Sequence, residues 1–157
     1  MRIAVANDHA GLLLKGHVLD HLRKLGHDVV DVGPNDTAPV DFPVVTQRVT
    51  DLVRSGEAER GVLVCGTGVG ACIAANKVSG IRAALIHDTY VARQAVEHDD
   101  VNVACLGAWI VGPTIAGEVL TSFLGARFST DEDFRRRVAQ LRAMDERREG
   151  ASPSPQR

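Results

Sequence analysis

Short apolar runs alternate with amphipathic segments along almost the whole chain, and this alternation limits the fold more than any other feature. The apolar runs predict strands at 2–6, 27–33, 60–65, 81–86 and 101–107. The segments between and after them carry apolar residues at helical spacing and predict helices at 10–26, 43–55, 69–78, 89–99 and 113–125. Continuous apolar strands joined by helices are typical of a parallel sheet covered on both faces. We therefore expect a Rossmann-like, doubly wound α/β fold with about five parallel strands.

A further, heavily charged helix is expected at 132–148, after the last strand. Two placements are open for it: against its own sheet, or across to a second subunit. The final EGASPSPQR is rich in small residues and proline, which predicts a disordered tail over 149–157. A chain of 157 residues is one domain's length. We therefore expect a single domain over residues 1–148.

Composition limits the classes of partner. The formal net charge is −2, and 24% of the residues are charged, so charge alone suggests neither a nucleic-acid nor a membrane partner. The chain starts directly with a strand-like run and has neither a signal peptide nor an apolar stretch long enough for a membrane helix. We expect a cytoplasmic protein with a small-molecule partner. The three cysteines fit neither a disulfide framework nor a zinc site, so free thiols are expected.

In doubly wound folds, ligands bind beyond the carboxyl ends of the strands. The polar residues that follow the predicted strands are therefore site candidates: Asn7, Asp8 and His9, then 65–70, His87 and Asp88, and 107–109. The segment 64–70, VCGTGVG, stands out among them. Its spacing differs from that of a dinucleotide fingerprint, it lacks the P-loop lysine, and Ala71 stands where a cysteine phosphatase needs arginine.

The glycines of this loop still allow several backbone N–H groups to converge on one point. They could bind a phosphate, a carboxylate or an oxyanion formed during a reaction, or they could simply make a tight turn. A thiol at Cys65, beside those N–H groups, is expected to have its thiolate stabilised and to serve as base or nucleophile. Cys72 and Cys105 are expected in the core. His9 and His98 stand at element ends and are the candidate catalytic histidines, although either could be structural.

Three stretches carry a resemblance to a known family: NDHAG, LVCGTGVGACIAANKVSGIRAAL and EHDDVNVACLGAWIVG, in this order. Together they closely resemble the ribose-5-phosphate isomerase B family, which includes the galactose-6-phosphate isomerase subunits, over residues 1–147. The resemblance implies a Rossmann-type dimer or tetramer with active sites at the subunit interface, needing no metal or organic cofactor. It also implies an aldose–ketose isomerase acting on a sugar through a cis-enediolate, for which a base and oxyanion donors are needed.

The resemblance also implies residue roles. Cys65 would be the base, because Ala71 occupies the place where another branch of the family has a glutamate. His98 would open the sugar ring by protonating its oxygen. Thr67 would assist the loop backbone in holding the enediolate. The residues expected to bind substrate are Asp8, His9, Gly66, Thr67, Gly68, Val69, Gly70, Asp99 and Arg137.

The chain departs from the family at the phosphate end of the substrate. Asp99 stands in place of an asparagine, Trp109 and Asp133 each in place of an arginine, and Phe134 often in place of a histidine; Arg137 remains. Because phosphates are usually held by arginine, two possibilities are open. The substrate could be a tetrulose phosphate, an unphosphorylated sugar or a sugar acid, with Trp109 stacked on it. Alternatively Arg135 or Arg136 compensates, and ribose 5-phosphate remains the substrate.

His87 and Tyr90, in HDTY, could line the pocket or cap the following helix.

Two other functional classes compete with the isomerase: a non-catalytic nucleotide- or sugar-binding module, and a non-catalytic partner subunit. The loop spacing argues against the first, and intact Cys65, Thr67 and His98 argue against the second.

Overall fold

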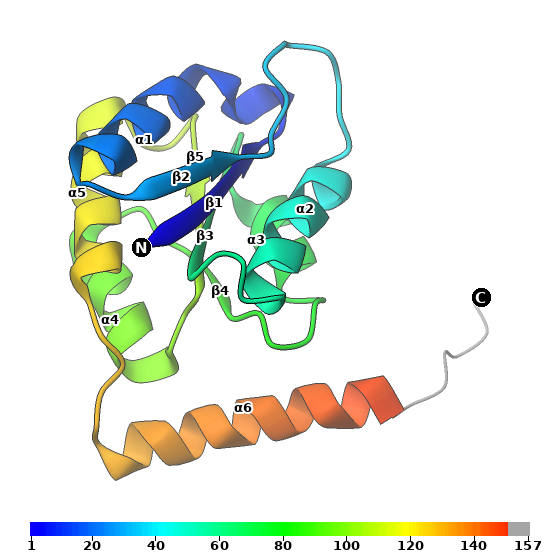
Figure 1. Cartoon of the computed structure of the whole chain (residues 1–157), viewed down its shortest axis with the longest axis vertical. Coiled ribbons are helices and arrows are strands. Elements are labelled where there is room, and N and C mark those ends of the chain that lie inside the picture. Colours follow the sequence, from blue (N-terminus) through cyan, green and yellow to red (C-terminus); the bar gives the residue numbers. More distant parts are fainter. Residues whose placement is uncertain (151–157) are drawn as a thin grey trace.

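A five-stranded parallel sheet forms the centre of the protein (Figure 1). The computed structural model describes the backbone of residues 1–150 and the side chains of residues 1–147. The strands are β1 (Arg2–Asn7), β2 (Asp28–Asp31), β3 (Arg60–Cys65), β4 (Ala83–Leu85) and β5 (Val103–Gly107), in the order β2-β1-β3-β5-β4. The expected doubly wound α/β fold is confirmed.

Helices cover both faces of this sheet. On one face lie α1 (Leu12–Lys24), α4 (Thr89–Asp99) and α5 (Pro113–Gly125), and on the other α2 (Phe42–Arg54) and α3 (Val69–Ala75). The strands are apolar at successive positions because each face needs a core. In β1, for example, Ile3 and Val5 join the core under α1 and α5, whereas Ala4 and Ala6 join the core under α2.

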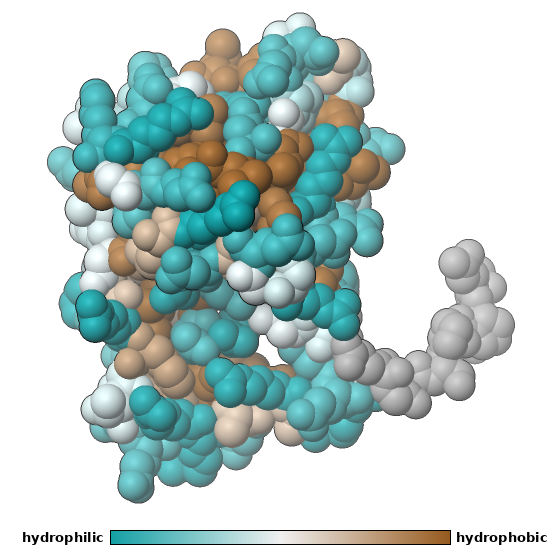
Figure 2. All heavy atoms as spheres, in the orientation of Figure 1, coloured by the Kyte–Doolittle hydropathy of each residue, from teal (hydrophilic) through white to brown (hydrophobic). Residues whose placement is uncertain are grey.

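The last helix, α6 (Glu132–Gly150), lies outside these two layers, next to the amino ends of the strands (Figure 1). Val138 is its buried anchor, at 2% exposure. Asp145 Oδ2 accepts a hydrogen bond from the Gly80 amide at 3.0 Å, and Arg142 pairs with Asp100 at 3.2 Å. The helix therefore contacts its own chain at the end of α4 and at the loops before β4 and β5, not on a face of the sheet. Figure 2 shows α6 as mostly hydrophilic, with an opening between it and the rest of the molecule.

Several boundaries differ from the expected ones. β4 covers three residues of the predicted strand 81–86, and β2 covers four of 27–33. α6 continues to Gly150, two residues beyond the expected domain end, and the rest of the predicted tail, 151–157, lies outside the described residues. Gly26, with φ of 81°, follows α1 in the left-handed conformation that often ends a helix. Among the helices of residues 1–150, none is long and apolar enough to cross a membrane.

Candidate active site

The carboxyl ends of β1, β3 and β5 bring the first group of predicted site residues together. Cys65 is the last residue of β3 and pairs with Gly107, the last of β5. Asp8 follows β1, and its amide donates to the Val64 carbonyl at 3.1 Å, which fixes it beside the end of β3. Cys65, Asp8 and the glycine loop therefore share one edge of the sheet, as the fold class predicts.

Asp8 is held there by a short 3₁₀ turn (His9–Gly11) that precedes α1. Its Oδ1 accepts a hydrogen bond from the Gly11 amide at 2.9 Å, and the residue is 6% exposed. Gly11 has to be glycine, because a Cβ there would lie 2.0 Å from the Val64 carbonyl oxygen. His9, on the same turn, accepts a weak hydrogen bond from the Val40 amide at 3.4 Å through Nδ1. The turn thus packs directly on the strand that ends in Cys65.

The protonation of Cys65 differs from the expectation of a stabilised thiolate. Burial raises the pKa of the Cys65 thiol, and a hydrogen bond to Asp8 raises it further. The backbone N–H groups of Gly68 and Gly66 do lower this pKa, as expected, but they do not compensate. In the single chain Cys65 is therefore held as a thiol beside a carboxylate. The expectation was wrong because sequence spacing does not show how closely Asp8 approaches the sulfur.

The glycine loop is shaped by close packing as well as by backbone angles. Gly68 has φ of 82°, and a Cβ there would lie 2.5 Å from Leu85 Cδ1 and 3.0 Å from the Leu106 carbonyl carbon. Gly70 packs under the ring of Phe42, where a Cβ would be 3.1 Å from the nearest ring atom. Phe42 is a residue of this edge that the sequence pattern does not indicate, because it stands just before the predicted helix 43–55; in the structure it begins α2. Thr67 Oγ1 accepts from the Val69 amide at 3.4 Å.

A second segment, 107–111, lies along the glycine loop. The Ala108 amide donates to the Cys65 carbonyl at 2.8 Å, and the Trp109 amide donates to the Gly66 carbonyl at 3.0 Å. The Trp109 ring is 71% exposed and covers Gly66, where a Cβ would lie 2.9 Å from the ring. Trp109 therefore packs directly on the glycine loop at Gly66.

Three of the predicted residues, His98, Asp99 and Arg137, lie at the opposite edge. His98 and Asp99 end α4, which returns the chain to the amino end of β5. His98 Nδ1 lies 3.2 Å from Gln94 Nε2, and the His98 ring stacks on Phe134 with centroids 3.9 Å apart. The five residues of β5 separate this edge from Cys65, a distance of at least about 13 Å at about 3.3 Å per residue. Within one chain, Cys65 and His98 are not brought together.

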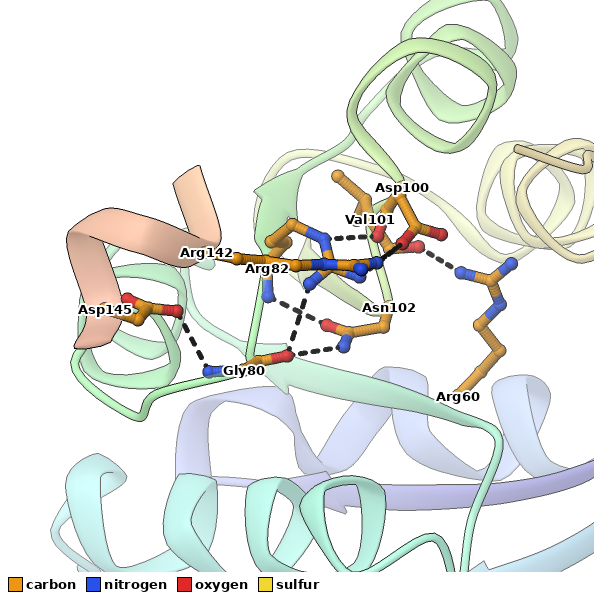
Figure 3. Close-up of polar contacts among 8 residues, drawn as sticks. All are labelled: Arg60, Gly80, Arg82, Asp100, Val101, Asn102, Arg142 and Asp145. Atoms are coloured by element: carbon orange, nitrogen blue, oxygen red, sulfur yellow. Dashed lines mark hydrogen bonds and ion pairs between the residues drawn. The ribbon is translucent and has the colours of Figure 1, made fainter. Parts of the chain in front are cut away.

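Charged side chains hold this second edge in place (Figure 3). Arg82 Nη2 pairs with Asp100 at 2.7 Å, and Arg142 of α6 pairs with the same carboxylate. Asp100 has φ of 50°, which turns the chain sharply after α4. Arg60 donates to the Val101 carbonyl from the far side (Figure 3). This network fixes the end of α4, and with it His98, relative to α6.

On α6, the surviving arginine is already paired. Arg137 Nη2 lies 3.7 Å from Asp133 Oδ2, and Arg136 Nη1 lies 2.6 Å from Asp133 Oδ1. The Arg137 guanidinium also lies over the Phe134 ring, 5.6 Å from its centroid. Asp133 therefore offsets positive charge that an anionic ligand would need. Among the described residues, no group of three or more His, Cys, Asp or Glu side chains is placed to hold a metal ion.

Comparison with known proteins identifies the family. The family model described as Ribose/Galactose Isomerase matches residues 3–141. Ribose-5-phosphate isomerase B of Escherichia coli is 37% identical and covers 94% of this chain and 98% of that protein. D-erythrulose-4-phosphate isomerase of Pectobacterium atrosepticum is 40% identical over 82% of this chain and 85% of that protein.

Solved structures agree with these relatives. Ribose-5-phosphate isomerase B of Clostridium thermocellum has a TM-score of 0.91 and 38% identity, covering 94% of this chain and 99% of that one. The Mycoplasma genitalium enzyme with bound ribulose-5-phosphate has a TM-score of 0.87 and 37% identity, over 92% of this chain and 96% of that one. The resemblance seen in the three sequence stretches is thus confirmed, and the chain belongs to the ribose/galactose isomerase family of aldose–ketose isomerases.

Proposed function

We propose that this isomerase moves a proton between C1 and C2 of a small sugar phosphate through a cis-enediolate, with Cys65 as the base. The observation that carries the proposal is that Cys65 ends β3 beside Asp8, whose amide donates to the Val64 carbonyl at 3.1 Å, and opens the glycine loop that leads into α3. Hydrogen bonds of the Gly66 and Gly68 amides lower the pKa of the Cys65 thiol, and one with Asp8 raises it. The amides supply donors for the oxygens that become negative as the C–H proton leaves. Asp8 accepts the hydrogen bond of the thiol, so it can take up the thiol proton when the thiolate forms.

The complete site requires two copies of the chain. Cys65, Asp8 and Trp109 lie at one edge of the sheet, whereas His98, Asp99 and Arg137 lie at the other. We propose a homodimer, or a tetramer of such dimers, in which the His98 edge of one copy faces the Cys65 edge of the other. Closed two-fold symmetry would then give two equivalent sites per pair. His98 protonates the ring oxygen so that a cyclic sugar can open before Cys65 acts.

A second candidate substrate follows from the residues expected at the phosphate end of the sugar. Trp109 covers Gly66, and Asp133 pairs with Arg137, so apolar surface and negative charge occupy places where the family has arginine. A ring over the loop favours a shorter or less charged substrate, such as a tetrulose phosphate, an unphosphorylated sugar or a sugar acid. The named relatives include both a ribose-5-phosphate and an erythrulose-4-phosphate isomerase. Because all three cysteines are free thiols, we place the reaction in the cytoplasm.

Proton exchange tests the base directly. The purified protein is incubated in D₂O with ribose 5-phosphate, erythrulose 4-phosphate and their dephosphorylated forms, and deuterium at C1 or C2 is followed by NMR. We expect exchange and turnover with the phosphorylated sugars, and a loss of about 1,000-fold or more in Cys65→Ala. Cys72→Ala, which removes a half-buried thiol of α3, should keep most of the activity. Full exchange in Cys65→Ala would exclude this thiol as the base.

Mixing two inactive variants tests the shared site. Cys65→Ala and His98→Ala are each expected to fail on cyclic substrate. Random pairing of the two chains puts both intact residues into one site of each mixed dimer, so co-expression should restore about a quarter of the wild-type activity. If the mixture stays inactive although mixed dimers are shown by tagged purification, Cys65 and His98 do not meet across subunits.

A further inference from the structure

The His87 side chain accepts a hydrogen bond from a backbone amide at the point where the pairing of β4 with β5 ends. β4 finishes at Leu85, and the ladder to β5 continues once more, with the Ile86 amide donating to the Cys105 carbonyl at 3.0 Å. The next donor on β5 is the Gly107 amide. It donates to His87 Nε2 at 3.0 Å, so a side chain replaces the carbonyl that a longer strand would have offered.

This hydrogen bond requires a neutral imidazole with its proton on Nδ1. A ring nitrogen accepts only when it carries no proton, and both nitrogens of a charged histidine are donors. Burial lowers the pKa of His87, whereas the charge of Asp88 raises it. Asp88 stands at the start of α4, where its Oδ1 accepts from the Val91 amide at 2.8 Å, and on the β3 side Cys65 pairs with Gly107. His87 is therefore neutral at neutral pH and becomes charged only below the ordinary histidine pKa.

Gly107 in turn fixes the segment that carries Trp109. Its carbonyl accepts from the amides of Ile110 and Val111, both at 3.0 Å, which closes the turn. A Cβ at Gly107 would lie 2.7 Å from the Thr67 carbonyl oxygen, so Gly107 also packs directly on the catalytic loop. Any movement of Gly107 would shift both the loop and the turn over it.

We propose that His87 is a positioning residue of the isomerase: its neutral imidazole holds the Gly107 amide and so keeps the Trp109 turn packed on the glycine loop at Gly66 and Thr67. The inference deepens the proposed function and depends on it only for its kinetic consequence. Its structural consequence is that acid, by charging His87, removes the acceptor of the Gly107 amide and loosens the Trp109 turn.

The first test is spectroscopic and needs no substrate. Trp109 is the single tryptophan of the chain, so its emission and its quenching by acrylamide report on this turn alone. In the wild type we expect a reversible change between about pH 8 and about pH 5. His87→Ala should show the acid-type emission at every pH. His87→Gln, whose amide oxygen accepts but does not titrate, should lack the acid transition. His17→Ala, a matched change on the exposed surface of α1, should keep it.

The second test is kinetic, at about pH 8 where His87 is neutral. Losing one backbone hydrogen bond should lower kcat/KM by about tenfold in His87→Ala, and His87→Gln should recover most of that loss. Circular dichroism shows whether the alanine variant folds; if it does not, the glutamine variant decides by the loss of its acid transition. An acid transition that persists in His87→Gln, or wild-type emission and kcat/KM in His87→Ala, would overturn the proposal. A wild type without turnover would refute the proposed function but leave the fluorescence test intact.

Discussion

The two edges of the sheet are built by different means. At the carboxyl edge, Cys65 and its loop are held by main-chain hydrogen bonds and by glycines with no room for a Cβ, such as Gly11 and Gly68. At the amino edge, His98 is placed by an ion-pair network around Asp100 and by stacking on Phe134. Backbone packing tolerates few substitutions, whereas the exposed ion pairs of the amino edge, such as that of Arg136 with Asp133, can be exchanged at little cost in stability.

This difference agrees with the departures from the family that the sequence resemblance implies. Asp99, Asp133 and Phe134 all belong to the amino edge, and Asp133 and its arginine partners are exposed. The loop around Cys65 is intact, and the departure nearest to it, Trp109, replaces a side chain without disturbing the main-chain bonds to Cys65 and Gly66. In the proposed function, the rigid edge therefore carries the chemistry of proton transfer. Substrate choice then depends on exposed residues such as Asp133, which the fold leaves free to vary.

The largest effect is expected from adding one methyl group to the rigid edge. Gly68→Ala places a Cβ 2.5 Å from Leu85 Cδ1 at φ of 82°, so the loop has to move. Because the amide of Gly68 points at the Cys65 sulfur, we expect kcat/KM to fall about 100-fold or more. Steady-state kinetics with the phosphorylated sugars measures this fall in kcat/KM.

Gly16→Ala is the matched control for that change. Gly16 lies within α1, with nothing within 4 Å of its Cβ position. Alanine should stabilise the helix by about 0.5–1 kcal/mol in thermal or urea unfolding and leave kinetics unchanged. A Gly68→Ala enzyme with wild-type kcat/KM would show that the loop can accommodate a Cβ at this position without loss of catalysis.

An intermediate effect is expected at the contact between Asp8 and Cys65. Asp8 raises the pKa of the Cys65 thiol, so Asp8→Asn should lower it and increase the thiolate fraction at any pH below that pKa. Alkylation of Cys65 by iodoacetamide, followed by mass spectrometry at about pH 7, should speed up about tenfold. Isomerase activity should fall, because the carboxylate that receives the thiol proton is gone.

Asparagine is the informative substitution because it can still cap the 3₁₀ turn at Gly11. Asp20→Asn, on the exposed side of α1, removes the same charge far from the thiol and should change neither rate. Slower alkylation in Asp8→Asn would mean that Asp8 stabilises the thiolate, the reverse of what the contact implies.

The sequence predicts some features of the two edges and not others. Strand positions and the cluster at the carboxyl edge follow from apolar runs ended by polar residues, since parallel strands present their carboxyl ends together. The protonation of Cys65 and the cover of Gly66 by Trp109 depend on approaches of a few ångströms between distant segments, which no spacing reveals. The place of α6 was equally undetermined, because its contacts are with Gly80 and Asp100, at loops far away in the chain.

The smallest effect is expected at the exposed edge, from Asp133. Two arginines keep the pKa of this carboxyl below its usual range, so it is ionised throughout the working pH range and offsets the charge of Arg137. Asp133→Asn should free Arg137 for an anionic group and lower KM for phosphorylated sugars by about two- to threefold, with less effect at high salt. KM for unphosphorylated sugars should stay the same. Glu132→Gln removes the same charge from the same turn and serves as control. Equal changes in KM for both kinds of sugar would place Arg137 away from the phosphate.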